Sequence, residues 1–171
     1  MRILIFSDNH GDQENLRRVI KKIGHVDRIF SLGDSEMRDI ELTLLNVVGV
    51  KGNYPFEPKF PYELSFVFHD QLVFLTHGHL YHVKLGLSSL VNHADNIGAK
   101  IVCFGHTHRP LLEVINDIIF VNPGALANKR SGDNPSYGII EITEEETTVV
   151  IKNVYDNIIK ELRKKHGKKS N

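Results

Sequence analysis

Residues 101–108 read IVCFGHTH, an apolar run that ends in a glycine followed by two spaced histidines. Short runs rich in Ile, Val, Leu and Phe that stop at a turn-forming cluster are typical of buried β-strands. The same arrangement occurs upstream, where residues 2–10 read RILIFSDNH and residues 72–79 read LVFLTHGH. We therefore interpret each of these stretches as a buried strand followed by a loop that carries polar side chains.

Further apolar runs and helical patterns lie around these three stretches. The other runs lead to turn-forming clusters at Gly33-Asp34, Gly52-Asn53 and Asn122-Pro123-Gly124. The clearest helical pattern has apolar residues at 16, 19, 20 and 23, the spacing of one helix face, with Asp12 as its N-cap. Weaker patterns at 40–45 and 85–91 indicate two more helices.

The order of these elements predicts the fold class. Strands alternate with helices over residues 1–105, which is typical of βαβ units, whereas consecutive antiparallel strands follow near 111–115, 118–122, 137–142 and 147–153. An apolar stripe at 155, 158, 159 and 162 predicts a final helix that leads into a basic tail. We expect an α/β (α+β) fold with a two-layered sheet core flanked by helices. It forms a single domain at 1–153, followed by a C-terminal helix and basic tail at 154–171.

Composition excludes several classes of protein. With 41% apolar and 25% charged residues in 171, the chain has ordinary globular usage, which excludes a disordered or fibrous protein. Lys+Arg and Asp+Glu are both 21, and this balance argues against nucleic acid or an anionic membrane as a partner. One cysteine excludes an intrachain disulfide, and no apolar run approaches the roughly 20 residues of a membrane span. We expect a cytoplasmic protein, with homo-oligomerisation left open.

Chemistry-bearing side chains follow five of the apolar runs. They are Asp8 and His10, Asp34, Asn53, His77 and His79, and His106 and His108. In open α/β sheets, sites form beyond the carboxyl ends of the strands, so these groups are expected to lie together. Oxygen and imidazole ligands without sulfur favour Mn, Fe, Zn, Co or Ni over calcium.

The number of ligands indicates two ions rather than one. Even seven of these eight side chains exceed what one cation takes, but seven ligands suit two cations that share a carboxylate. Asp34 is the natural bridge because it stands alone at its strand end. Two dications against two carboxylates leave a positive site that attracts an anion. Such a pair clamps phosphoryl oxygens and generates hydroxide, which predicts hydrolysis of a small phosphoester by in-line attack of a bridging hydroxide.

The ordered motifs resemble those of the calcineurin-like metallophosphoesterases. The likeness covers residues 1–142 and rests on Asp8-Asn9-His10, Gly33-Asp34, Gly52-Asn53, His77-Gly78-His79 and Gly105-His106-Thr107-His108. The short chain and Asn122-Pro123-Gly124 resemble the small bacterial and archaeal phosphodiesterase branch, to which the retromer scaffold subunit is related. The resemblance implies a four-layer αββα sandwich of two mixed β-sheets flanked by helices.

The resemblance also implies the ligand sets. One ion would be held by Asp8, His10, Asp34 and His108, and the other by Asp34, Asn53, His77 and His106. Manganese is the frequent ion of such enzymes, with Fe, Zn, Ni or Co as alternatives. Asp34, Asn53 and His79 are the candidate catalytic residues.

One position departs from the family pattern. Many relatives follow the Gly-Asn pair with a histidine that assists the leaving group, whereas this chain has Tyr54-Pro55. Protonation of the leaving group then falls to His79, Tyr54 or solvent.

Two alternatives to a phosphodiesterase stay open. They are a non-catalytic protein-binding scaffold of the same fold and a metal-dependent nuclease.

Overall fold

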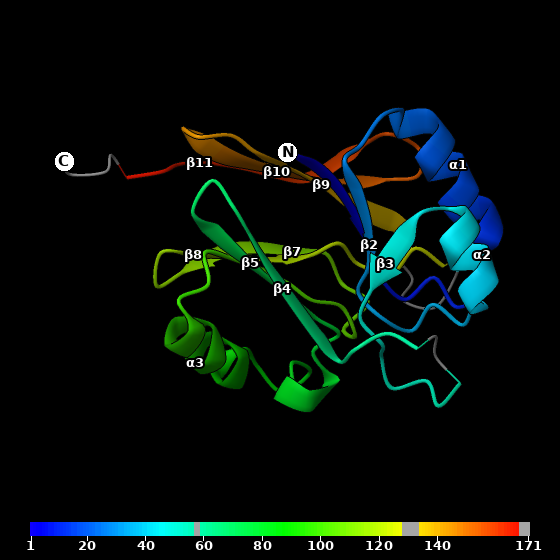
Figure 1. Ribbon diagram of the computed structural model, residues 1–171, viewed down its shortest axis with the longest axis horizontal. Coiled ribbons are helices and arrows are strands. Elements are labelled where there is room, and N and C mark those ends of the chain that lie inside the picture. Colours follow the sequence, from blue (N-terminus) through cyan, green and yellow to red (C-terminus); the bar gives the residue numbers. More distant parts are fainter. Residues whose placement is uncertain (57–58, 128–133, 168–171) are drawn as a thin grey trace.

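Two mixed β-sheets lie face to face in the computed structural model, which describes residues 1–56, 59–127 and 134–167 (Figure 1). The first sheet has the order β11-β10-β9-β1-β2-β3. Its strands are β1 (Arg2–Phe6), β2 (Arg28–Ser31), β3 (Val47–Gly49), β9 (Ser136–Ile142), β10 (Glu146–Asn153) and β11 (Ile158–Lys165). β1 runs parallel to β2 and antiparallel to β9.

The second sheet has the order β4-β5-β6-β8-β7. Its strands are β4 (Glu63–Phe68), β5 (Gln71–Thr76), β6 (Ile101–Cys103), β7 (Leu111–Ile115) and β8 (Ile118–Asn122). β5, β6 and β8 are parallel, and β4 and β7 pair antiparallel at the two edges. The parallel centre therefore brings the carboxyl ends of β5 and β6 to the same edge.

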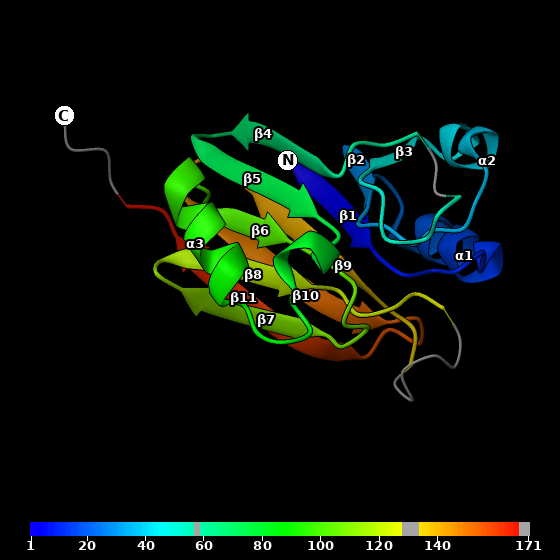
Figure 2. The same cartoon turned by 90° about the horizontal axis from the view of Figure 1, so that it is seen from below.

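Helices cover the outer faces of both sheets (Figures 1 and 2). α1 (Gln13–Ile23) and α2 (Asp39–Leu44) share an apolar cluster with β1, and α3 (Ser88–Ile97) shares one with β5 and β6. The 3₁₀-helix η1 (His79–Tyr81) follows β5. A third cluster, which includes Ile3, Ile5 and Leu75, fills the space between the sheets. This confirms the predicted four-layer sandwich.

Local capping follows the sequence at α1. The Asp12 side chain accepts a hydrogen bond from the backbone N–H of Asn15 at 3.0 Å, as an N-cap does. None of the helices in the described ranges is long and apolar enough to cross a membrane.

The structure corrects the prediction of a C-terminal helix. Residues 158–165 form β11, which pairs antiparallel with β10 over most of its length. The stripe that suggested a helix includes Leu162, which packs on the core between the sheets, and Ile158, which is 56% exposed. Pairing with β10 overrides the local pattern. The end of the predicted basic tail, residues 168–171, lies outside the described residues.

Two smaller differences concern β4 and α3. β4 alternates partly buried and exposed residues, and Leu64 and Phe66 face the core between the sheets, so a strand precedes the run at 72–75. The helix expected at 85–91 begins later, at Ser88, because Lys84, Leu85 and Gly86 are exposed and lie in the preceding turn.

Candidate metal centre

Six of the predicted ligands come from loops at the carboxyl ends of β1, β2, β5 and β6. Backbone hydrogen bonds join these loops: Asp8 N–H donates to Gly33 O at 3.0 Å, and Gly105 N–H donates to His77 O at 3.1 Å. His106 N–H donates to Asp8 Oδ2 at 3.0 Å, across the two sheets. The ends of both sheets thus form one site.

Five of these ligands have a left-handed backbone, a conformation that is uncommon for residues other than glycine. They are Asp8 (φ 52°), His10 (φ 44°), Asp34 (φ 48°), His106 (φ 67°) and His108 (φ 60°). Such conformations persist only where the surrounding structure holds them, and they cluster at functional sites. Here they turn side chains from separate strand ends toward one point.

Three motif glycines allow the loops to approach one another. A Cβ at Gly105 would collide with Ser7 Oγ and lie 2.9 Å from Asp8 Oδ2. One at Gly33 would lie 2.6 Å from His77 Nδ1, and one at Gly52 would lie 2.6 Å from the Asp34 nitrogen. Any side chain at these three positions would displace a candidate metal ligand, which is Asp8, His77 or Asp34.

The Asp8 carboxylate lies at the centre of the site. Its Oδ2 accepts a hydrogen bond from Ser7 Oγ at 2.5 Å. Its Oδ1 lies 3.1 Å from His108 Nε2, 3.9 Å from His77 Nε2 and 4.0 Å from His10 Nε2. Burial raises the pKa of Asp8, but the hydrogen bond from His108 and the charge of His77 outweigh it, so the pKa is lowered. The carboxylate is therefore held in its charged form.

His77 is oriented by a backbone carbonyl. Its Nδ1 lies 2.7 Å from Leu32 O, which can only accept, so Nδ1 carries the proton and Nε2 faces the site. This Nε2 lies 3.5 Å from Asp34 Oδ2 and 3.2 Å from His106 Nδ1. The site thus crowds carboxylate oxygens and imidazole nitrogens around one buried point.

The pKa shifts reflect this crowding. Burial lowers the pKa of His77, but the hydrogen bond to Asp34 and the Asp8 charge raise it above its usual value. Asp34 has a lowered pKa, since the His77 hydrogen bond and charge outweigh burial. Burial and the charges of His77 and Lys84 lower the pKa of His106 to about 4. The lowered pKa values of Asp8 and Asp34 keep both carboxylates charged, as the ligands of a cation must be.

Two ligand groups have atoms within 4.8 Å of one another: Asp8 with His10 and His108, and Asp8 with Asp34 and His77. These sets fit divalent ions, because each residue offers an oxygen or a ring nitrogen. The first set reproduces three of the four ligands implied for one ion. In the second set, Asp8 as well as Asp34 lies within reach of His77.

Residues 1–145 match the calcineurin-like phosphoesterase superfamily domain. This chain belongs to that superfamily.

Individual relatives of this calcineurin-like phosphoesterase span nearly its whole length. It is 33% identical to a probable metallophosphoesterase, YsnB, of Bacillus subtilis, over 95% of this chain and 97% of that protein. It is 26% identical to the phosphodiesterase MJ0936 of Methanocaldococcus jannaschii, over 88% and 99%. A crystal structure of a predicted phosphoesterase from Streptococcus pneumoniae matches with a TM-score of 0.84 at 27% identity, covering 96% of this chain and 97% of that one.

The sequence analysis did not identify Glu36, which contacts the candidate metal ligand His10. Its Oε1 lies 2.6 Å from His10 Nδ1. A carboxylate on one ring nitrogen leaves the other nitrogen for a metal and fixes the ring. Glu36 follows the Gly-Asp pair at a left-handed position (φ 53°). No spacing signal in the sequence marks it.

Asn122 supports the loop that carries His106 and His108. It is fully buried, and its Nδ2 donates to Gly105 O at 2.8 Å and to Thr107 Oγ1 at 3.1 Å. Its Oδ1 accepts from Gly124 N–H at 2.9 Å. The Asn122-Pro123-Gly124 element therefore supports the loop of these two candidate ligands as well as turning the chain.

Asn53 and His79 lie beside the cluster rather than within it. Asn53 is exposed and lies between Gly52, where a Cβ would collide with Asp34, and Tyr54, whose N–H donates to Asp34. The His79 ring lies 5.4 Å from that of His77, and its buried Nδ1 has no hydrogen-bond partner among the described residues. Burial and the His77 charge lower the pKa of His79, which favours a neutral ring.

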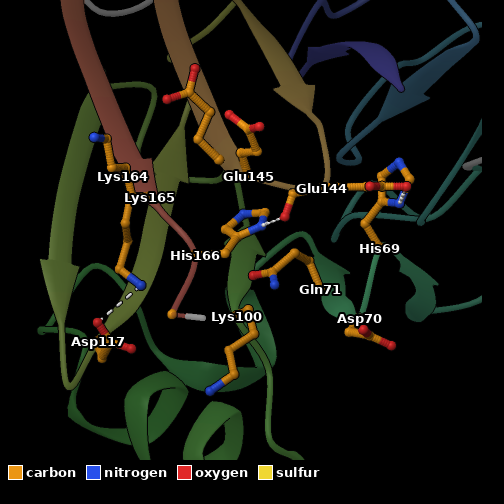
Figure 3. Close-up of a pocket in the computed structure, with 12 residues that line it drawn as sticks. His69, Asp70, Gln71, Lys100, Asp117, Glu144, Glu145, Lys164, Lys165 and His166 are labelled. Carbon is orange, nitrogen blue, oxygen red and sulfur yellow. Dashed lines mark hydrogen bonds and ion pairs between the residues drawn. The ribbon is translucent and has the colours of Figure 1, made fainter. Parts of the chain in front are cut away.

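The large cleft of this calcineurin-like phosphoesterase lies elsewhere, at the opposite ends of the strands. It has a volume of about 1010 Å³ and is lined by charged residues of both signs (Figure 3). Gln71, the first residue of β5, lines the cleft, whereas His77 follows the last residue of that strand. Lys164 Nζ pairs with Asp117 Oδ1 at 2.9 Å beside it. None of the candidate ligands lines this cleft.

Proposed function

We propose that this chain is a phosphodiesterase that uses two divalent cations, most readily Mn²⁺, held where the carboxyl ends of the two sheets meet. The observation that carries the proposal is the convergence of two carboxylates and four imidazoles on this point. Five of these six residues have left-handed backbones. The name of the archaeal relative, a phosphodiesterase, supports a diester as substrate.

We assign the ligands as the family resemblance implies. Asp8, His10, Asp34 and His108 hold one ion, and Asp34, Asn53, His77 and His106 hold the other. Asp34 suits the bridge because Tyr54 N–H occupies its Oδ1 at 2.9 Å, which leaves Oδ2 toward His77. Asp8 is restrained in a similar way, with Oδ2 held by Ser7 Oγ and His106 N–H, whereas Oδ1 faces the Nε2 atoms of His108 and His77.

When bound, a pair of divalent cations neutralises phosphoryl oxygens and makes water nucleophilic near neutral pH. The protein residues set the geometry for this chemistry. Glu36 orients His10 and Leu32 O orients His77, so that Nε2 of each ring faces the carboxylates. His79 lies beside His77 and His106, in position to donate a hydrogen bond to a phosphate or leaving-group oxygen.

The direct test is metal-dependent hydrolysis. Protein stripped with a chelator and reloaded with Mn²⁺, Fe²⁺, Zn²⁺, Ni²⁺ or Co²⁺ is assayed with bis(p-nitrophenyl) phosphate, p-nitrophenyl phosphate and a linear DNA oligonucleotide. We expect diester hydrolysis that depends on the metal and exceeds monoester hydrolysis. Cleavage of the oligonucleotide in preference to the small diester supports the nuclease. Metal binding without turnover of any substrate supports the scaffold and overturns the proposal.

The ligand assignment has its own test. Metal stoichiometry is measured by mass spectrometry for Asp34→Asn and Asp8→Asn. If Asp34 bridges, Asp34→Asn loses both ions whereas Asp8→Asn retains one. The reverse result assigns the bridge to Asp8.

This chain has Tyr54 at the position where many relatives have a histidine. We therefore expect the rate of hydrolysis to depend on the leaving group. With no histidine there, a good leaving group, which departs without a proton, reacts faster than a poor one. We expect a higher kcat/KM for a p-nitrophenyl diester than for its alkyl counterpart. Equal values contradict this role for position 54.

A further inference from the structure

Loop 54–62 is fixed at both ends beside the candidate metal centre. At its start, Tyr54 N–H donates to Asp34 Oδ1 at 2.9 Å. Near its end, Phe60 packs on the apolar cluster beneath α1 and α2, and Pro61 O accepts from Lys51 N–H at 2.9 Å. The loop therefore holds its first residues against a metal ligand.

The aromatic side chains of this loop differ in their surroundings. Phe60 is partly buried, and Tyr62 already has neighbours: Lys51 Nζ lies 3.9 Å from its ring centroid and the His79 ring lies 5.8 Å away. Phe56 is 80% exposed, and the ring contact that the structure gives it is the edge-on packing with Tyr54 at 5.8 Å and 72°. Phe56 thus offers an open aromatic face.

Phe56 follows two residues after Tyr54, whose backbone contacts the candidate metal centre. Tyr54 contacts Asp34 through its backbone and Phe56 through its ring. An exposed aromatic ring on a segment that adjoins a phosphate-binding centre matches a nucleotide, whose flat base lies one ribose from its phosphate. Bases stack on exposed aromatic side chains with little dependence on base identity. A lipid tail would instead require an extended apolar groove.

We propose that Phe56, supported by Tyr54, stacks on the base of a nucleoside phosphodiester whose phosphate lies at the candidate metal centre. This rests on the proposed function and names its substrate class. The base belongs to the part of the substrate that stays on the phosphate, so stacking lowers KM and leaves the chemistry of the leaving group unchanged.

The test compares two diesters with the same leaving group. Thymidine 5′-(p-nitrophenyl phosphate) and methyl p-nitrophenyl phosphate both release p-nitrophenol, and only the first carries a base. We expect a KM on the order of tenfold lower for the thymidine ester in the Mn²⁺-loaded protein. Equal KM values for the two esters overturn the inference.

Variants assign the effect to the ring. In Phe56→Ala, the KM ratio between the two esters is expected to fall to about one, whereas Phe56→Trp keeps it. Leu85→Ala removes a side chain that is 91% exposed and lies outside the loop, and it should keep the wild-type ratio. A Phe56→Ala protein that keeps the ratio contradicts the inference. Melting temperatures of all variants show whether they are folded.

Failure of the proposed function is distinguishable from failure of the stacking site. If neither ester is hydrolysed, the proposed function fails. Calorimetry with thymidine 5′-monophosphate and the Mn²⁺-loaded protein then decides the inference alone. Weaker binding by Phe56→Ala than by wild type supports it, and equal binding or no binding overturns it.

Discussion

The two ends of the same strands carry polar loops with left-handed residues, yet the loops differ in what holds them. At the far end, His69 and Asp70 have φ values of 46° and 59°, and Asn116 and Asp117 have 49° and 65°. Each pair is the two-residue connection of a hairpin, β4–β5 or β7–β8, where positive φ is the ordinary requirement of the turn. Their conformation is explained by local geometry.

At the end that carries the candidate metal centre, the positive φ values of the candidate ligands do not come from hairpin turns. Asp8 and Asp34 follow parallel strands, and their loops are held by contacts from other strands, such as His106 N–H to Asp8 and Tyr54 N–H to Asp34. Long-range contacts that maintain an unfavourable backbone indicate function. Positive φ values therefore indicate a functional site only where the local turn does not require them.

Removal of one carboxylate charge at each end of the strands should have the largest difference in effect. We expect Asp34→Asn to lower kcat/KM by on the order of 10³-fold and to lose metal, because two cations lose a shared ligand. Asp117→Asn, which alters an exposed ion pair with Lys164, should leave metal content and kcat/KM unchanged. Retention of both ions and full activity in Asp34→Asn would show that the ligand assignment is wrong.

Acidification should release the metals, since protons compete for the imidazole ligands. The raised pKa of His77 in the metal-free chain means that this competition begins at or above the ordinary value of 6.5 and strengthens as pH falls. Affinity should fall about tenfold per pH unit for each imidazole that is protonated. Metal content after dialysis at pH 8, 6 and 4 measures this. An unchanged content at pH 4 would argue against these ligands.

Each end of the strands also has a carboxylate–histidine pair, so one variant at each end can be compared in metal affinity. Glu36 lies 2.6 Å from His10, and Glu144 lies 4.0 Å from His69 at the far end. We expect Glu36→Gln to weaken metal binding about 10–100-fold, because His10 loses the group that orients it. Glu144→Gln should not change it. Titration calorimetry with Mn²⁺ measures both, and equal affinities would mean that Glu36 has no positioning role.

The smallest expected effect concerns two glycines. Gly105→Ala forces a Cβ against Ser7 and Asp8, and we expect it to lower the free energy of unfolding by about 1–3 kcal/mol. Gly167→Ala, with open space around it beside the far cleft, should have no such effect. Denaturant unfolding of the metal-free proteins compares them. Equal stability of the two variants would contradict the close approach of the loops.

The sequence predicted that the candidate ligands lie close together because each motif directly follows a strand. The rule that strand carboxyl ends meet at one edge placed Asp8, Asp34, His77 and His106 together without tertiary information. Glu36 was beyond this reasoning, because its contact with His10 depends on the path of a left-handed loop. The tilted contact between the Tyr62 and His79 rings likewise depends on how two separate loops meet.

The same reasoning was wrong where periodicity was ambiguous. The stripe at residues 155–162 fits a helix face, but β10 offers an unpaired edge that the segment completes as β11. At β4, by contrast, a usable signal was present, since Leu64 and Phe66 alternate with exposed positions, as a half-buried strand does.

Anomalous diffraction from crystals grown with Mn²⁺ tests the central claim most directly. We predict two manganese peaks about 3.5–4 Å apart. Asp34 should lie between them, and His108 and His77 should be on opposite sides. A single peak, no peak among these residues, or peaks only in the charged cleft at the far end would contradict the account.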